Sequence, residues 1–174
     1  MFFDRTSQSG PQQAVCHKKD GSWQWLTWSE LEQRVKDLAR GMSDWVEVGE
    51  IVCLLSENRP EWWLADLGTL SLGGVSAPIY ATNPPKDIAY ILNDTGARTL
   101  FVSSREQLDK VRKIKEEDKV PKLERVIVFD DVQSDEEWVL SLDEVMKRNA
   151  GAEDPIPARL EQIAPDDLAT LIYT

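Results

Sequence analysis

Residues 51–55 read IVCLL, and three similar apolar runs follow: VSAPIY at 75–80, TLFV at 99–102 and RVIVF at 125–129. The starts of these runs lie 24, 24 and 26 residues apart. Short apolar runs at this interval, with helix-length segments between them, are typical of right-handed βαβ units. The pattern therefore predicts an α/β fold with a mostly parallel sheet and flanking helices, whose strands cover residues 51–56, 75–80, 99–103, 125–129 and 168–174.

The segments between these runs carry helix signals. Pro60 opens the segment PEWWLADLGTLSL, which Gly73 ends, and Pro85 opens PKDIAYILNDT, which Gly96 ends. Proline in the first turn and glycine just past the last is the usual asymmetry of a helix. The third segment, SREQLDKVRKIKEE, has its apolar residues on one helical face. Three helices are therefore predicted between the first four strands.

The first 42 residues predict a β-hairpin followed by a helix. Asp20-Gly21 separates two runs with strand-like alternation, and this dipeptide favours a tight hairpin turn. Thr27 followed by Glu30 has the spacing of a capping box, which predicts a helix that starts at Trp28. After residue 129 we expect an acidic surface loop over 130–138 and a short helix over 141–149.

Pro78 has no amide donor for a sheet ladder, so we expect it at an edge, a strand end or a bulge. The loop that follows, Tyr80 to Pro85, should then lie at the carboxyl end of the sheet. Open α/β folds bind their ligands at that end. This position makes the loop a candidate border of a ligand cleft.

Composition excludes several classes of protein. With 174 residues, 41% of them hydrophobic and 29% charged, the chain fits one soluble globular domain or the opening part of a larger one. A formal net charge of -11 makes a nucleic acid an unsuitable partner. The start MFFDRTSQSG lacks the basic region and apolar run of a signal peptide, so we expect a cytoplasmic protein.

Few residues have the types that catalytic or metal sites use. One histidine, His17, and two cysteines, Cys16 and Cys53, are too few for a zinc site, so no metal ligand is predicted and the thiols should be free. No catalytic residue is predicted either. We expect Trp62 and Trp63 to pack against the sheet, and we interpret the acidic run over 130–137 as a solvated loop rather than a cation site.

Three longer stretches resemble a known family: LTWSELEQRVKDLARGM (26–42), the residues from VGEIVCLL to TLFV (48–102), and DDLATLIYT (166–174). They are similar to the start of the adenylate-forming (AMP-binding) enzymes, which include acyl-CoA synthetases, luciferases and the adenylation domains of peptide synthetases. SENRPEW (56–62) and PIYATNPP (78–85) look most like the long-chain fatty acid CoA ligase branch. Glu50 departs from the family, which more often has Asp there, and the charge is kept.

The resemblance implies that residues 1–174 are the N-terminal part of an AMP-binding domain and end at the start of its phosphate-binding loop. Tyr173 and Thr174 match the first two positions of that loop, which makes them the predicted ATP-binding residues. The family's activity implies ATP, Mg²⁺, CoA and a fatty acid in the intact enzyme, with peripheral membrane contact through the acyl substrate. No cofactor is expected on these 174 residues, which we predict to be inactive alone.

Two other functions stay open at this point. The chain could be a free-standing α/β module that serves only for association, although an apolar strand at its terminus would then be an aggregation liability. An adenylating enzyme for another carboxylic acid would differ only in its acyl pocket. The residues that follow Thr174 in the gene would distinguish these alternatives.

Overall fold

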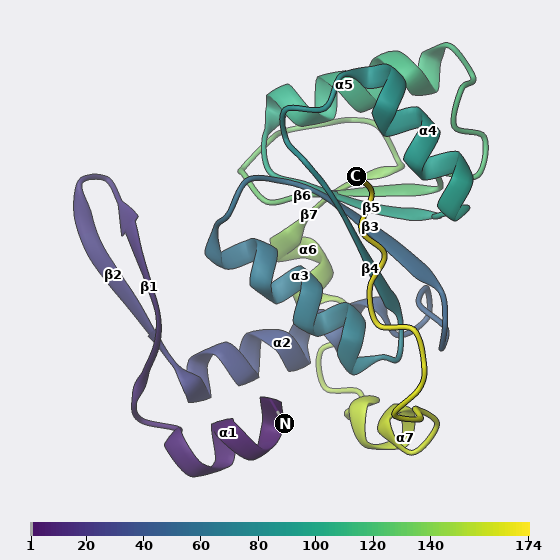
Figure 1. Cartoon of the computed structure of the whole chain (residues 1–174). Helices are drawn as coiled ribbons and strands as arrows, with labels where there is room; N and C mark the ends of the chain where they lie inside the picture. Colours follow the sequence, from purple (N-terminus) through teal and green to yellow (C-terminus); the bar gives the residue numbers. More distant parts are fainter. Residues whose placement is uncertain (1) are drawn as a thin grey trace.

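The chain folds as a parallel sheet between two helical layers, with a hairpin that extends from one side (Figure 1). The computed structural model describes residues 2–174. In chain order the elements are α1 (Phe2–Ser9), β1 (Gln13–Lys19), β2 (Ser22–Thr27), α2 (Trp28–Met42), β3 (Ile51–Leu55), α3 (Pro60–Ser71), β4 (Val75–Ile79), α4 (Pro85–Thr95), β5 (Thr99–Val102), α5 (Arg105–Glu116), β6 (Arg125–Val128), β7 (Val139–Ser141), α6 (Leu142–Lys147) and α7 (Ile156–Leu160).

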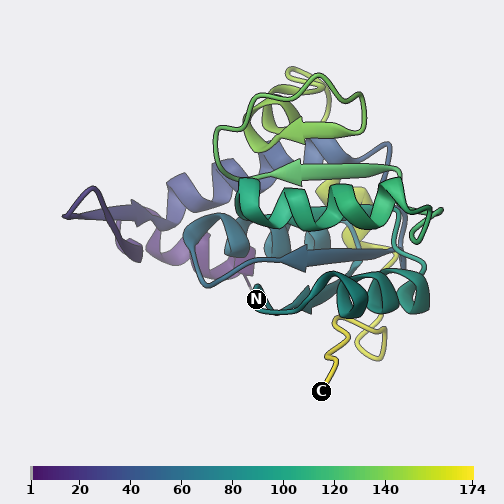
Figure 2. The same cartoon turned by 90° about the horizontal axis from the view of Figure 1, so that it is seen from above.

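The central sheet has five strands in the order β4-β3-β5-β6-β7, and every neighbouring pair is parallel. Its arrows point in one direction in Figure 2. The register places Val52 beside Ser76 on one side and beside Thr99 on the other. The predicted α/β class and the four predicted strands that begin at residues 51, 75, 99 and 125 are therefore confirmed.

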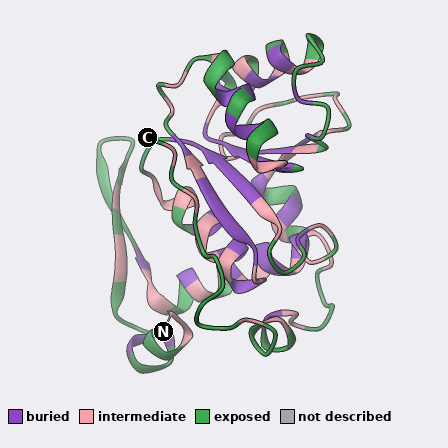
Figure 3. Cartoon of the chain, turned by 45° about the vertical axis from the view of Figure 1, so that its right-hand side comes forward, coloured by how far each residue is buried: buried purple, intermediate pink, exposed green. Residues whose placement is uncertain are grey.

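Alternate residues of each strand face two separate apolar cores, because side chains of a strand alternate between the faces of its sheet. Cys53 and Leu55 pack with residues of α4 and α5. Val52 and Leu54 pack with residues of α2, α3 and α6. The strands are buried on both faces, whereas the hairpin and the C-terminal segment are largely exposed (Figure 3).

The hairpin and the helix after it form as predicted. Asp20 and Gly21 take the positive φ values of 51° and 80° that a tight hairpin turn requires. The Glu30 amide donates to Thr27 Oγ1 at 3.2 Å, and the Thr27 amide donates to Glu30 Oε2 at 2.8 Å. This reciprocal capping box starts α2 at Trp28.

The predicted strand over 168–174 does not form. Its only pairing among the described residues is one parallel bridge, with Thr170 opposite Ser76. The Ser76 amide donates to the Ala169 carbonyl, and the Leu171 amide donates to the Ser76 carbonyl. The next bond of this ladder would need an amide from Pro78, which has none. Pro78 therefore lies on the sheet edge, as predicted, and also ends the pairing that the sequence pattern favours.

Three elements were not predicted, and one of them is the five-residue helix α7. The helix α1 covers the first described residues, where the sequence analysis considered only a leader peptide. The strand β7 has three residues and pairs with β6 through Ile127 and Leu140. A run this short shows no alternation, so only its neighbour in the sheet makes it a strand. Among the described residues, no helix has the length and the apolar character that a membrane crossing requires.

Candidate functional site

The carboxyl edge of the sheet is the natural place for a site, because the chain reverses its winding direction there. From β3 the chain passes through α3 to β4 on one side, and from β4 through α4 to β5 on the other. The loops that leave β3 and β5 therefore diverge to opposite faces of the sheet. Ligands of open α/β folds bind in the crevice that such a switch point creates.

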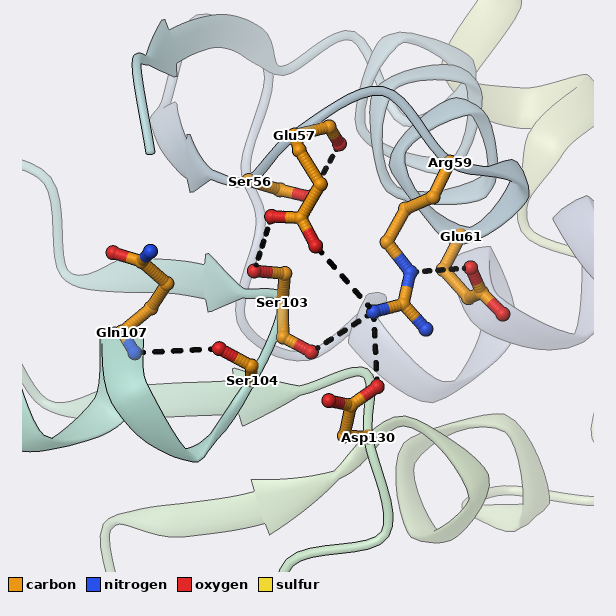
Figure 4. A network of polar contacts seen from close by, with 8 residues as sticks. All are labelled: Ser56, Glu57, Arg59, Glu61, Ser103, Ser104, Gln107 and Asp130. Carbon is orange, nitrogen blue, oxygen red and sulfur yellow. Dashed lines mark hydrogen bonds and ion pairs between the residues drawn. The ribbon is translucent and has the colours of Figure 1, made fainter. Parts of the chain in front are cut away.

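A network of polar contacts lies at this edge of the sheet (Figure 4). Arg59, from the loop after β3, donates through Nε to Glu61 Oε2 at 2.7 Å and through Nη1 to Asp130 Oδ1 at 2.9 Å. The same Nη1 donates to the Ser103 carbonyl at 3.1 Å. Ser103 in turn donates its hydroxyl to Glu57 Oε2 at 2.7 Å. The network thus joins the loops after β3, β5 and β6, and we call it the Arg59 clamp.

The Arg59 clamp is partly shielded from water, since the Arg59 side chain is only 23% exposed. Its guanidinium also lies 5.6 Å from the ring centre of Phe129. Burial by itself would raise the pKa of Glu61, but the hydrogen bond from Arg59, a backbone hydrogen bond and the charge of Arg59 together lower that pKa below its usual value. Because Nε and Nη1 already bond carboxylates, the arrangement fits a structural tie between loops better than a phosphate site.

The loop over 80–85 lies at the same edge of the sheet, and a lysine of α5 bonds its backbone carbonyls. Lys110 donates through Nζ to the Ala81 carbonyl at 2.7 Å and to the Asn83 carbonyl at 3.5 Å. Tyr80 stays 69% exposed at the start of the loop. The sequence predicted the place of this loop, and the structure adds the lysine that fixes it.

A broad groove of about 1410 Å³ runs between the hairpin and the carboxyl edge of the sheet. One wall carries His17 and Lys18 of β1, and the opposite wall carries Arg59 and Asp130 of the Arg59 clamp. Charges of both signs line it, so it does not select a strongly anionic or cationic ligand. Among residues 2–174, no group of three or more ligating side chains is arranged as a metal site.

Tyr173 and Thr174, the predicted ATP-binding residues, lie at the end of the C-terminal segment beside β4. The Tyr173 hydroxyl donates to Asp94 Oδ2 at 2.6 Å, and its ring meets the ring of Tyr90 edge-on at 6.4 Å. Burial, and then the hydrogen bond to Asp94, raise the pKa of Tyr173 to about 12. Thr174 is exposed. These two residues do not form a phosphate cradle by themselves, and their role in ATP binding stays a prediction.

The other candidate residues are scattered rather than gathered at this edge. Cys16 is exposed and His17 half-buried on β1, and both cysteines are free thiols, as predicted. Trp62 packs on the apolar core, but Trp63 is 47% exposed, so the expectation that both pack against the sheet is wrong for Trp63.

The Arg59 clamp was not predicted from the sequence. The acidic run over 130–137 was expected to be a solvated loop, but Asp130 pairs with Arg59, and Glu136 pairs with Arg112 at 2.6 Å. The positions of the two residues relative to the predicted strands could have indicated the contact. Arg59 follows one strand, and Asp130 follows another strand whose carboxyl end lies at the same edge of the sheet. Their sequence separation hides this proximity.

Comparison with known proteins agrees with this fold. The family model described as AMP-binding enzyme matches residues 3–174. The long-chain-fatty-acid–CoA ligase ACSBG1 of Homo sapiens is 26% identical over 177 residues, which cover 100% of this chain and 24% of that protein. The long-chain-fatty-acid–CoA ligase FadD15 of Mycobacterium bovis is 31% identical over 158 residues, which cover 89% of this chain and 25% of that protein.

Solved structures show the same arrangement of elements. A long-chain-fatty-acid–CoA ligase from Archaeoglobus fulgidus superposes with a TM-score of 0.81 at 23% identity, over 99% of this chain and 33% of the other. The A-PCP didomain of carboxylic acid reductase from Segniliparus rugosus, solved in complex with AMP, has a TM-score of 0.78 at 20% identity, over 99% of this chain and 29% of that one. The chain spans about a quarter of the length of these curated relatives. With a family model that matches nearly every residue, the chain belongs to the AMP-binding enzyme family.

Proposed function

We propose that residues 1–174 are the N-terminal part of the AMP-binding domain of a long-chain fatty acid CoA ligase. The observation that carries this proposal is the family match over residues 3–174, together with curated relatives that are long-chain-fatty-acid–CoA ligases. The parallel sheet supports it, because it directs residues 168–174 along β4 towards the edge where ligands of α/β folds bind. The alternative of a module that serves only for association has no observation in its favour.

The proposed reaction has two steps. An oxygen of the fatty carboxylate attacks the α-phosphorus of ATP, which forms acyl-AMP as the bond to pyrophosphate breaks. The CoA thiol, which gives up its proton, then attacks the acyl carbonyl carbon, and AMP leaves. Mg²⁺ neutralises phosphate charge when it is bound in such enzymes. Residues 2–174 offer neither a metal cluster nor a complete phosphate cradle, so no step of this chemistry is assigned to them.

We assign Tyr173 and Thr174 to the first two positions of the ATP phosphate loop. Support comes from their place at the end of a segment that runs parallel to β4. In this arrangement Thr174 is exposed, and Asp94 holds the Tyr173 hydroxyl. A Gly-rich continuation would supply the converging amides that phosphates need. Thr174→Ala in the full-length enzyme should raise the KM for ATP and leave the KM for the fatty acid unchanged.

The loop over 80–85 is proposed to border the ligand cleft of the intact enzyme. Tyr80 is exposed there, and Lys110 fixes the backbone that carries it. Tyr80→Ala and Thr82→Ala in the full-length ligase should change the kinetics for the acyl substrate or CoA. Unchanged kcat and KM values for both substrates would show that the loop only connects β4 to α4.

We also propose a cytoplasmic enzyme that meets membranes only through its acyl substrate. The experiment for the function as a whole measures pyrophosphate release with ATP, Mg²⁺, palmitate and CoA. The full-length gene product should turn over, whereas the 174-residue chain should not exceed a blank without protein. A full-length enzyme that prefers benzoate or an amino acid to palmitate would identify a ligase for another acid. Turnover by the 174-residue chain would contradict the assignment of the catalytic groups to later residues.

A further inference from the structure

The helices α1, α2 and α3 surround an apolar pocket of about 510 Å³ outside the Arg59 clamp. Its walls include three tryptophans, one from α2 and two from α3, namely Trp28, Trp62 and Trp63. A phenylalanine and two leucines complete the apolar lining. This volume lies within the range of about 300–1,000 Å³ that is typical of small-molecule sites. The pocket is thus large enough for an aromatic or short aliphatic ligand.

Two charged side chains line this pocket, the carboxylate of Asp66 and the guanidinium of Arg5, and the structure shows no ion pair between them. Within residues 2–174 no lysine, arginine or histidine pairs with the Asp66 carboxylate. Burial raises the pKa of Asp66, and the neighbouring Ser76 hydroxyl offsets that effect only in part. An anionic group that loses part of its hydration and has no counter-ion is costly, and a bound cation would relieve that cost.

The tryptophans add a second feature that favours a cation. The face of an indole ring carries negative potential and attracts cations within about 6 Å of its centre. Arg5 already uses Trp28 in this way, with its guanidinium carbon 5.8 Å from the ring centre. Among the residues that the structure describes, no cation lies over Trp62 or Trp63. Trp62 packs partly on the apolar core, whereas the Trp63 ring is 47% exposed and is the one most accessible to a ligand.

We propose that this pocket binds a small organic cation with an apolar body, such as an aryl or alkyl quaternary ammonium. The apolar walls match the body, and Asp66 and the exposed indole of Trp63 match the charge. A metal cation does not fit, because one carboxylate supplies too few oxygen ligands. An anionic ligand would have to lie beside Asp66 without a partner of its own, since Arg5 is engaged with Trp28 and Ser9.

Isothermal titration calorimetry on the 174-residue chain tests this proposal with three probes of similar shape. Benzyltrimethylammonium carries the positive charge, benzyl alcohol is neutral, and phenylacetate is negative. The cation should bind at least about tenfold more tightly than the alcohol, since a cation–π contact and a partly desolvated ion pair together reach that scale. Equal affinity for the alcohol, or tighter binding of phenylacetate, would overturn the proposal.

Variants separate the charge of Asp66 from its structural role. Asp66→Asn should weaken binding of the cation about tenfold and leave benzyl alcohol unaffected, whereas Asp87→Asn on the exposed start of α4 should change neither. Arg5→Gln removes a competing positive charge and should strengthen cation binding about two- to threefold. If Asp66→Asn fails to fold, Trp63→Leu provides the same test, because its exposed ring can be removed without opening the core. Cation binding unchanged in the folded variants would refute the site.

Discussion

Replacement of Arg59 by leucine tests the Arg59 clamp most directly, because one side chain joins three loops. The variant loses two partly exposed ion pairs, to Glu61 and Asp130, which contribute about 0.5–1 kcal/mol each. It also loses the bond to the Ser103 carbonyl and the contact with Phe129, about 1 kcal/mol each at most. The Ser103 carbonyl keeps a second partner, the Asp130 amide at 3.2 Å, so no buried acceptor is left without a bond.

The expected loss is roughly 2–3 kcal/mol of unfolding free energy, since leucine regains part of the apolar contact. For a domain of this size that loss lowers Tm by roughly 5–10 °C. Urea unfolding and thermal denaturation by circular dichroism measure both quantities. Arg98→Leu is the matched control: its half-exposed side chain pairs with Glu124 at the opposite edge of the sheet, so no measurable change is expected.

The effect of Arg59→Leu on stability should depend on pH in one direction. The hydrogen bond and charge of Arg59 help to keep the folded-state pKa of Glu61 below its unfolded value. The stability that the Arg59–Glu61 pair contributes is therefore present at neutral pH and is lost as the pH falls through the folded-state pKa. The stability difference between wild type and Arg59→Leu should therefore narrow in acid. A loss no larger than that of Arg98→Leu, or a difference that does not depend on pH, would refute the view that Arg59 ties the loops together.

Three further predictions follow from single contacts. Thr27→Ala should lower the free energy of unfolding by about 1 kcal/mol, because it removes the capping box of α2. Ser104→Ala should lower it less, because the Ser104 hydroxyl lies 3.5 Å from the amide that it caps. Equal losses of unfolding free energy in urea would contradict this prediction. Ellman's reagent should modify one thiol in the native chain, the exposed Cys16, and two after denaturation, because Cys53 is buried and burial raises its pKa to about 12. Rapid modification of both thiols in the native chain would show that Cys53 on β3 is accessible to the reagent. Ultraviolet titration should show a tyrosine that ionises at unusually high pH, and this ionisation should be absent in Tyr173→Phe. Because the folded-state pKa of Tyr173 is raised, the stability that Tyr173 contributes should decrease above a pH of about 10. A titration curve identical in the variant would exclude the bond to Asp94.

Local sequence patterns were sufficient to predict those parts of the structure that neighbouring residues determine. The spacing of apolar runs indicated the parallel strands, and the Asp20-Gly21 turn and the Thr27 capping box indicated the hairpin and the start of α2. These features depend on backbone preferences and on hydrogen bonds between residues three or fewer apart in the chain. Family membership followed from the same stretches, because the resemblance lies in the order of residues along the chain.

Tertiary structure decided what depends on residues far apart in the chain. The segment over 168–174 has the composition of a strand, yet it forms a single bridge because Pro78 lies opposite it. The Arg59 clamp joins residues 59 and 130, which meet only because β3, β5 and β6 end at one edge of the sheet. The apolar pocket between α1, α2 and α3 likewise exists only because the packing of these helices brings Asp66 and three tryptophans to one cavity. A sequence records what each residue prefers, but which residues become neighbours depends on how the whole chain buries its apolar surface.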